Sequence, residues 1–259
     1  MDRCDHKRLV ELEERDLKLE IEGLSKSYGD KQVFQNFSCS FQQGITGILG
    51  PNGAGKSTLM NLITDNVKRD AGRILYGDKD VLELGKAFRS VLGYMPQEQG
   101  MYDDFSALVF LRYMAELKGL LKKEAMNQID SLLDLVALKN VSHRKLGTYS
   151  GGMRQRILLC QALLGSPEII ILDEPTAGLD VEERIKIMEY ITNLSKGRIV
   201  LWSTHIVSDI EHTASNILIM RSGENLVYAP VGQLIKAKSS KDLSEAYLKY
   251  MDTAPRGEA

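Results

Sequence analysis

Hydrophobic and polar residues follow each other in two different patterns along this chain. In LKLEIEGL, Leu17 to Leu24, apolar and charged residues alternate one by one, which predicts an edge strand with one buried face. The segments ITGILG and EIIILDEP are apolar almost throughout, as strands covered on both faces are. Further strands are expected in VFQNFSCSF, RILYGDKDV, SVLGYMP and RIVLWSTH, and a hairpin in NILIMRSGENLVYAP.

From Phe105 to about Leu164 the apolar residues recur at steps of three and four, which predicts helices in SALVFLRYMAELKGL and KEAMNQIDSLLDLVAL. Shorter helical patterns occur in LMNLITDN, VEERIKIMEYITNLS and IVSDIEHTA. The charges of VEERIKIMEY are interpreted as a solvated helix face. Because the long helical block separates two groups of strands, we expect an insertion in an α/β core. Strands that alternate with helices predict a mainly parallel sheet with functional loops at its carboxyl edge.

The composition is that of an ordinary globular protein. The 259 residues are 43% hydrophobic and 26% charged, and the net charge of −2 gives no electrostatic reason to expect nucleic acid as a partner. Three widely spaced cysteines, Cys4, Cys39 and Cys160, indicate neither a disulfide framework nor a zinc site, so we expect a reducing cytosol. No segment has the roughly 18 continuous apolar residues that span a bilayer, and the charged start MDRCDHKRLVELEERD does not have the pattern of a signal peptide. Association with a membrane would therefore require a partner.

The stretch GPNGAGKST matches the phosphate-loop pattern G-x-x-x-x-G-K-[ST] between an expected strand and an expected helix. Its glycines allow backbone N–H groups to converge on phosphate oxygens, and the helix start adds unpaired donors. Lys56 is expected to reach the β- and γ-phosphates, and the Ser57 hydroxyl to ligate Mg²⁺. The alternative is a plain glycine-rich turn. The predicted nucleotide-binding residues are Gly50, Pro51, Asn52, Gly53, Ala54, Gly55, Lys56, Ser57 and Thr58.

The apolar segment EIIILDEP ends with two carboxylates, Asp173 and Glu174. A strand this apolar is expected at the centre of the sheet, which would place Asp173 beside Ser57 as a partner of Mg²⁺, directly or through water. Because side chains alternate along a strand, Glu174 is expected to point the other way and to orient or deprotonate an attacking water. Without the phosphate loop, such an acidic strand end would be read as a solvated surface feature.

Together with four shorter motifs, these two stretches resemble the nucleotide-binding subunit of an ABC transporter over about residues 17–230. GPNGAGKST resembles the family's Walker A loop, IIILDEP its Walker B strand, YSGGMRQR its signature, MPQ its Q-loop, AGLD its D-loop and WSTH its switch-histidine loop. The short motifs are weak singly, but all six occur in the family's order. The resemblance implies a P-loop NTPase (RecA-like) core with a mainly parallel sheet, an antiparallel β subdomain and an inserted α-helical subdomain at about 98–164. The ATP-binding domain would cover 17–235, between a charged N-terminal extension (1–16) and a C-terminal helical tail (236–259).

Several residue roles are implied by this resemblance, position by position. Tyr28 resembles the aromatic residue that stacks on adenine, with a turn tyrosine as the alternative. Gln97 resembles the residue that contacts Mg²⁺ and the lytic water and couples to the membrane subunit. His205 resembles the histidine that contacts the γ-phosphate, and Asp180 the D-loop residue that reaches across a dimer interface. The other histidines lack such a context and are read as structural: His6, His143 and His212.

The stretch TYSGGMRQR has a Ser-Gly-Gly turn before a helix but no lysine. The resemblance explains it as half of a site. Ser150, with a helix-capping hydroxyl, Gly151 and Gly152 are expected to face an ATP held by the phosphate loop of another chain. Two positions depart from the family's usual LSGGQ, because Tyr149 replaces Leu and Met153 replaces Gln.

A third departure follows the Q-loop, where many family members have Thr-x-x-Glu. Ser106 is expected to cap a helix, but Val109 stands where Glu would close a capping box. This apolar helix face is a candidate docking site for a membrane subunit.

The resemblance therefore implies an ATP-hydrolysing subunit, with ATP and Mg²⁺ as cofactors, that drives export through a separate integral membrane permease. ATP would close a head-to-tail dimer with a second copy or a paralogue, and the chain would lie on the cytoplasmic side of the cell membrane. Its departures and single short domain are most similar to ABC-2-type exporters of peptides, antibiotics or ions. The competing hypothesis is a soluble ABC ATPase, such as one for iron–sulfur cluster assembly. Translation-associated members with two domains and chromosome-associated members with long coiled coils do not fit this length.

Overall fold

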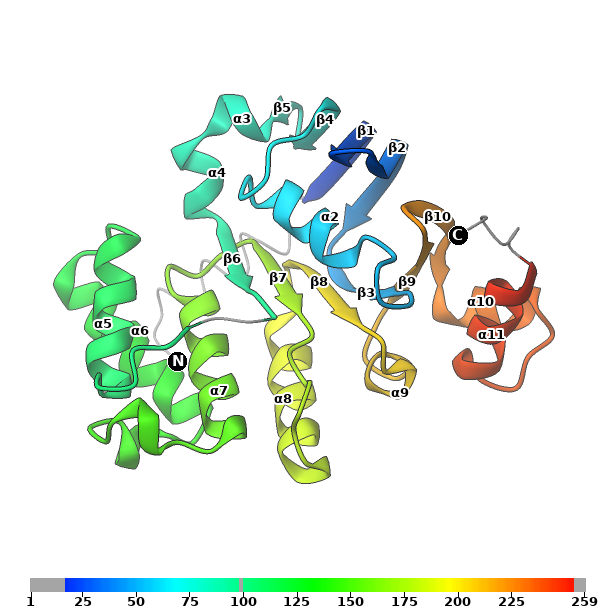
Figure 1. Ribbon diagram of the computed structural model, residues 1–259. Helices are drawn as coiled ribbons and strands as arrows, with labels where there is room; N and C mark the ends of the chain where they lie inside the picture. The colour runs from blue at the N-terminus through cyan, green and yellow to red at the C-terminus, as the bar shows by residue number, and fades with distance from the viewer. Residues whose placement is uncertain (1–16, 98–99, 254–259) are drawn as a thin grey trace. The chain divides into compact units, whose positions relative to one another are not determined.

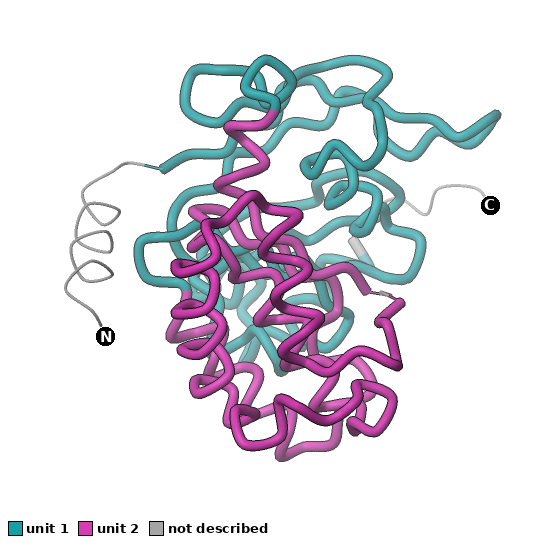
Figure 2. Tube along the Cα trace, turned by 90° about the vertical axis from the view of Figure 1, so that its left-hand side faces the viewer, with its two compact units in different colours: residues 1–85, 195–259 teal, residues 86–194 magenta. Residues whose placement is uncertain are grey.

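The computed structural model describes residues 17–97 and 100–253. The predicted N-terminal extension and the last six residues lie outside the described residues. Two compact units divide the chain, the first made of residues 1–85 and 195–259 and the second of residues 86–194 (Figure 2). The second unit is thus inserted in the sequence of the first.

An antiparallel sheet in the first unit has the strand order β2-β1-β4-β5 (Figure 1). Its strands are β1 (Lys18–Tyr28), β2 (Lys31–Gln42), β4 (Ala71–Tyr76) and β5 (Lys79–Asp80). Because β1 pairs with β2 on one side and with β4 on the other, the prediction of an edge strand at 17–24 is wrong. Alternation reports that one face of a strand is buried, and it carries no information on whether both edges are paired.

Parallel pairing dominates the other strands of the first unit. β3 (Gly44–Leu49) lies between β8 (Ile199–Thr204) and β9 (Asn216–Arg221) and is parallel to both. β10 (Glu224–Pro230) returns antiparallel to β9, which confirms the predicted hairpin. Leu49 is paired with Thr204, so the loops after β3 and β8 leave the sheet at the same edge.

The helices of the first unit are short. They are α2 (Lys56–Ile63), α3 (Val81–Leu84), α9 (Val207–Ile210), α10 (Val231–Ala237) and α11 (Leu243–Thr253). The longer helix expected in IVSDIEHTA is limited to α9, and the Ser215 N–H that follows this segment donates to the Ile45 carbonyl of β3 at 2.8 Å. α11 is held at both ends: the Leu243 N–H donates to Glu211 Oε1 at 2.9 Å, and Arg221 Nη1 donates to the Met251 carbonyl at 2.7 Å.

The second unit contains two parallel strands and most of the helical residues. Its elements are α4 (Lys86–Ser90), β6 (Leu92–Met95), α5 (Ala107–Leu117), α6 (Lys122–Leu135), the 3-10 turns at Lys139–Val141 and Leu146–Thr148, α7 (Gly151–Leu163), β7 (Ile169–Asp173) and α8 (Val181–Leu194). β6 pairs in parallel with β7, and Met95 is opposite Leu172. No helix in the described ranges is long and apolar enough to cross a membrane.

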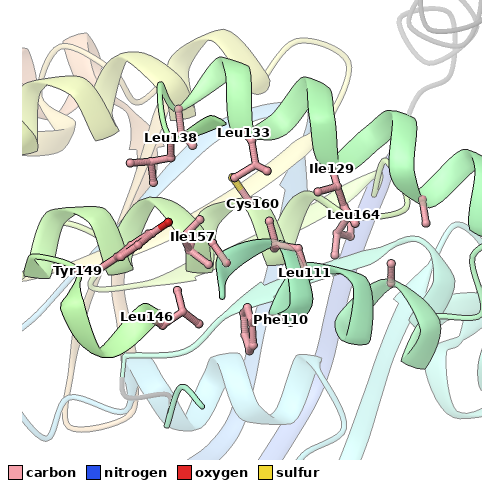
Figure 3. Close-up of a cluster of buried hydrophobic side chains, with 14 residues drawn as sticks. Phe110, Leu111, Ile129, Leu133, Leu138, Leu146, Tyr149, Ile157, Cys160 and Leu164 are labelled. Atoms are coloured by element: carbon pink, nitrogen blue, oxygen red, sulfur yellow. The ribbon is translucent and has the colours of Figure 1, made fainter. Parts of the chain in front are cut away.

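Helices α5, α6 and α7 enclose one hydrophobic cluster (Figure 3). Its labelled members are Phe110, Leu111, Ile129, Leu133, Leu138, Leu146, Tyr149, Ile157, Cys160 and Leu164. Tyr149, one of the departures from LSGGQ, is buried here and its hydroxyl donates to the Val141 carbonyl at 2.8 Å. The larger side chain is thus accommodated in the core with its polar atom satisfied. Burial raises the pKa of Cys160 to about 12, so this thiol is protonated and unreactive at neutral pH.

Two leucines of α5 provide a test of this core. Leu111 is fully buried in the cluster, whereas Leu117 is 64% exposed. We expect Leu111→Ala to lower the free energy of unfolding by about 2–5 kcal/mol, because it removes buried methyl groups and leaves a cavity. Leu117→Ala should change it by less than about 0.5 kcal/mol. Urea unfolding followed by circular dichroism measures both, and equal effects of the two substitutions would contradict the described packing.

Candidate functional site

The loop from Gly50 to Thr58 connects β3 to α2 in the first unit (Figure 1). Gly55 is the N-cap of α2 and has a φ of +102°, a left-handed conformation that glycine adopts without strain. No side-chain hydrogen bond caps this helix, and its first turn has no acidic residue. The first N–H groups of α2 and the positive end of its dipole are therefore suited to an anion.

Neighbouring strands hold this loop closely. A Cβ atom on Gly50 would lie 2.4 Å from the Met220 carbonyl oxygen, so only glycine fits beside β9. The Gly223 N–H, in the β9–β10 turn, donates to the Ala54 carbonyl at 3.0 Å. A Cβ on Gly55 would meet the Phe34 ring of β2 at 3.0 Å. The loop is thus fixed from both sheets of the first unit, which pre-organises its backbone donors.

Lys56 is buried, with 7% of its surface exposed, although it carries a charge. Its Nζ donates to the Gly50 carbonyl at 2.8 Å and to the Pro51 carbonyl at 3.3 Å. The ammonium group is therefore held over the loop by the loop's own carbonyls. Ser57 and Thr58 follow in the first turn of α2 and are half-buried. This arrangement places a cation and a helix start side by side, as phosphate binding requires.

Two further predicted residues of the first unit lie near strand ends. His205 comes directly after β8 and is exposed, so the pairing of Leu49 with Thr204 brings it to the sheet edge where the phosphate loop begins. Tyr28 ends β1 with 47% of its surface exposed. Lys26 Nζ lies 5.3 Å from the centroid of the Tyr28 ring, at a distance typical of a cation–π contact.

Gln97 and Asp173 come together in the same way in the second unit. Met95 and Leu172 are paired, so Asp173, the last residue of β7, and Gln97, two residues after β6, lie at the carboxyl ends of neighbouring parallel strands. Asp173 is buried and Gln97 is exposed. Burial, together with the negative charge of Asp173, raises the pKa of Tyr94 to about 12. The carboxylate of Asp173 is therefore buried at the end of β7, where its charge acts on the neighbouring Tyr94 hydroxyl.

Glu174 is buried and has a φ of +51°, a left-handed conformation that is uncommon for a residue with a Cβ atom. β7 ends at Asp173, so the alternation of side chains along a strand does not extend to Glu174. The reasoning that predicted its direction therefore does not apply. A strained backbone at a buried carboxylate is instead an independent sign of a functional position.

The Ser-Gly-Gly turn opens α7 in the second unit. Ser150 Oγ accepts from the Met153 N–H at 3.2 Å, which confirms that Ser150 caps the helix. Gly151 is exposed, and a Cβ atom there would have no neighbour within 4 Å. Met153 packs against the hydrophobic cluster. The position where the family usually has a glutamine is thus used for packing.

Asp180 is exposed and caps α8, because its Oδ1 accepts from the Glu183 N–H at 2.9 Å. Ser106 likewise caps α5 by accepting from the Val109 N–H at 3.3 Å, as predicted. Sequence reasoning missed one arrangement close to Asp180. Glu183, interpreted as part of a solvated face, has a side chain only 20% exposed that forms an ion pair with Arg156. The residue types along a helix face do not indicate which charged side chain forms an ion pair with a buried residue of another helix.

The three predicted Mg²⁺ ligands are a hydroxyl (Ser57), an amide (Gln97) and a carboxylate (Asp173), all hard oxygen donors that suit this cation. Ser57 belongs to the first unit, and Gln97 and Asp173 belong to the second. Within the described part of the chain there is no group of three or more His, Cys, Asp or Glu residues that could hold a metal ion.

A family model described as ABC transporter matches residues 34–177. An uncharacterized ABC transporter ATP-binding protein of Bacillus subtilis is 37% identical over 80% of this chain and 68% of its own length. The linearmycin resistance ATP-binding protein of the same organism is 34% identical over 80% of this chain and 67% of its length. The Nod factor export ATP-binding protein I of Burkholderia orbicola is 32% identical over 88% of this chain and 76% of its own length.

Solved structures agree with the predicted fold. The structure of an ATP binding subunit of an ABC transporter has a TM-score of 0.81 with this chain and covers 90% of it and 99% of that chain, at 24% identity. An ATP-binding cassette of an ABC transporter in its ADP conformation gives a TM-score of 0.75 with the same coverage and identity. These likenesses confirm the predicted α/β fold of a P-loop NTPase.

The conformation of Glu174 leads to a stability test. Both Glu174→Gly and Glu174→Ala remove the carboxylate, but only glycine relieves the left-handed backbone. We expect the Gly variant to be more stable than the Ala variant by about 1 kcal/mol, the reverse of the usual order in a helix. Chemical denaturation of the two purified variants measures the difference. Greater stability of the Ala variant would show that this backbone is not strained.

Proposed function

This chain belongs to the ABC transporter family of ATP-binding proteins, and we propose from that premise that it drives export of a substrate through a separate membrane permease. It is the ATP-binding subunit of an ABC transporter and an ATPase. The phosphate loop at 50–58, with buried Lys56 over the uncapped start of α2, is the observation that carries the assignment. The names of two similar proteins, one for resistance to linearmycin and one for Nod factor export, support the export direction.

Nucleotide binding is assigned to the first unit's loop. In this proposal the backbone N–H groups of Gly53 to Thr58 and the ammonium of Lys56 bind the phosphates, and Tyr28 stacks on adenine. Almost half of the Tyr28 surface is free for such stacking. Ser57, Gln97 and Asp173 would hold Mg²⁺, which would supply charge neutralisation at the phosphate oxygens.

Hydrolysis is assigned to in-line attack by water on the γ-phosphorus. A new bond forms from the water oxygen to phosphorus, and the bond from phosphorus to the β–γ bridging oxygen breaks, so that ADP leaves. Glu174 orients the water and accepts its proton, for which its burial excludes competing solvent. His205 contacts the γ-phosphate, and Gln97 positions the water. Lys56 stabilises the charge that develops on the phosphate.

The second anion site is proposed to act on another molecule's nucleotide. Ser150 and Gly151 are exposed at the start of α7, where no lysine stands beside the glycines. ATP on the phosphate loop of one copy would be completed by this turn of a second copy or a paralogue, with Asp180 at the same interface. ATP binding then favours the closed dimer, and hydrolysis favours the open one.

The permease is proposed to dock on α5 and the loop before it. Tyr102 stacks on Phe105 with ring centroids 4.9 Å apart, and Tyr113 meets both rings edge to face. Val109, Tyr102, Tyr113 and Leu117 are exposed apolar side chains in this region. Docking would place the chain at the inner face of the membrane. A soluble role in iron–sulfur cluster assembly is not favoured, because similar proteins are named as transporter subunits.

Glu174→Gln tests the catalytic assignment. The amide keeps the size of the carboxylate but cannot accept the proton of the water, so we expect ATP hydrolysis to fall by about 100-fold or more. Binding of ATP should persist, and ATP-dependent dimerisation should increase, because the closed state is no longer relieved by hydrolysis. Phosphate release and light scattering after size exclusion measure the two effects.

Glu189→Gln provides the control, since Glu189 is an exposed residue of α8. It should hydrolyse ATP at the rate of the unmodified chain. Undiminished hydrolysis by the Glu174→Gln variant would overturn the assignment of the water-activating residue.

A further inference from the structure

An ion pair inside the second unit joins the two helices that carry the proposed interface residues. Arg156 lies one and a half turns into α7, and Glu183 is the third residue of α8. Arg156 Nη2 and Glu183 Oε1 are 3.1 Å apart, and the two side chains are only 9% and 20% exposed. The pair is therefore largely removed from solvent, unlike the Glu182–Lys186 pair of α8, whose glutamate is 80% exposed.

The guanidinium of Arg156 connects three segments at once. Its Nε donates to the Gly152 carbonyl at 3.3 Å, in the first turn of α7. Its Nη1 donates to the carbonyl of Val136, the C-cap of α6, at 3.0 Å. Its third nitrogen, Nη2, donates to Glu183 Oε1. The planar guanidinium group thus fixes the Ser150–Gly152 turn, the end of α6 and the start of α8 relative to one another.

Gly152 is part of the same arrangement. A Cβ atom on Gly152 would lie 2.7 Å from Cδ and Oε2 of Glu183, whereas one on Gly151 would meet nothing within 4 Å. The two adjacent glycines thus differ in purpose. Gly151 leaves space open to the outside, and Gly152 leaves the space that the Glu183 carboxylate occupies.

Glu183 is anchored at its backbone as well. Its N–H donates to Asp180 Oδ1 at 2.9 Å, so the residue that contacts Gly152 through its side chain is bound to Asp180 through its main chain. A continuous series of contacts therefore runs from the Ser150–Gly152 turn through Arg156 and Glu183 to Asp180.

Stability alone is a poor explanation for this pair. Glu183 Oε2 is buried and has no hydrogen-bond partner among the described residues, which costs free energy. A buried ion pair also loses hydration, and two apolar side chains would hold the helices at least as strongly. A rigid fork with three fixed partners defines geometry, which apolar packing does less well.

We propose that Arg156 and Glu183 are positioning residues. They hold the Ser150–Gly152 turn and Asp180 in a fixed geometry, so that the turn and Asp180 reach the nucleotide of the other copy together. This inference rests on the proposed function, because it assumes that the turn acts on another copy's ATP. Neither residue needs to contact the nucleotide. Loss of the pair should weaken ATP-dependent pairing of two copies and leave each chain's own phosphate loop, in the first unit, unchanged.

Glu183→Gln tests this in a chain that also carries Glu174→Gln, so that ATP is not consumed. The amide keeps the shape but removes the charge that holds Arg156. We expect the dissociation constant of the ATP-bound dimer, measured by sedimentation, to rise about tenfold or more. The affinity of the monomer for a fluorescent ATP analogue at low protein concentration should change by less than about twofold. The neighbouring substitution Glu182→Gln, at the exposed pair, should alter neither quantity.

Hydrolysis gives a second measurement in chains with Glu174 intact. The Glu183→Gln chain should lose activity at low protein concentration and recover it as the concentration rises, because a weaker dimer is restored by mass action. Arg156→Lys keeps the charge but not the fork, and should behave in the same way. This variant decides the matter if Glu183→Gln does not fold.

A matched variant separates this inference from the proposed function. If Ser150→Ala weakens the dimer and Glu183→Gln and Arg156→Lys do not, the positioning role is wrong and the shared site stands. If Ser150→Ala also leaves the dimer intact, the shared site itself is wrong. A loss of monomer nucleotide affinity equal to the loss of dimer affinity would also overturn the positioning role, because it would reveal general damage.

Discussion

The first backbone N–H groups of α2, which no side chain caps, are the feature on which the proposed nucleotide chemistry depends. They become an anion site only because the chain reverses tightly between β3 and α2, which requires Gly55 in a left-handed conformation and Gly50 against the Met220 carbonyl. Lys56 then brings a full positive charge to the same place, buried over the loop's own carbonyls. Phosphate binding would exchange these neutral acceptors for charged ones, which bind an ammonium more strongly.

The start of α7 is also a helix N-terminus, but its chemistry differs from that of α2. Its Met153 N–H already donates to the Ser150 hydroxyl, and no lysine accompanies the glycines. We expect such a site to be too weak to hold a nucleotide by itself and to suit a γ-phosphate that is already bound elsewhere. The difference between the two helix starts is the physical reason to assign one to holding ATP and the other to completing the site of another copy.

Much of the fold could be predicted from the sequence, because its strands and helices have clear periods and the phosphate loop is a specific motif. The hairpin at β9–β10, the caps at Ser150 and Ser106 and the parallel sheet all followed from local rules. The edge position of β1 and the length of α9 were wrong, since pairing and chain direction depend on residues far away in the sequence.

The candidate site shows the same division between local and tertiary information. Tyr149 and Met153 looked like defects of a signature, but the structure shows that both side chains pack in the helical cluster. The left-handed backbone of Glu174 and the buried partner of Glu183 could not be read from their neighbours in the chain. Both depend on contacts between segments that no periodicity records.

Mixed dimers test the central claim, that the phosphate loop of one copy and the signature turn of another share one ATP. Chains with Lys56→Ala and chains with Ser150→Ala should each be nearly inactive as ATPases. When the two chains are mixed in equal amounts, half of the dimers contain one chain of each kind. Each mixed dimer combines both defects in one site and leaves the other site intact, so about a quarter of the unmodified activity should return. Activity in the mixture no greater than the mean of the separate variants would contradict a site shared between two copies of this chain.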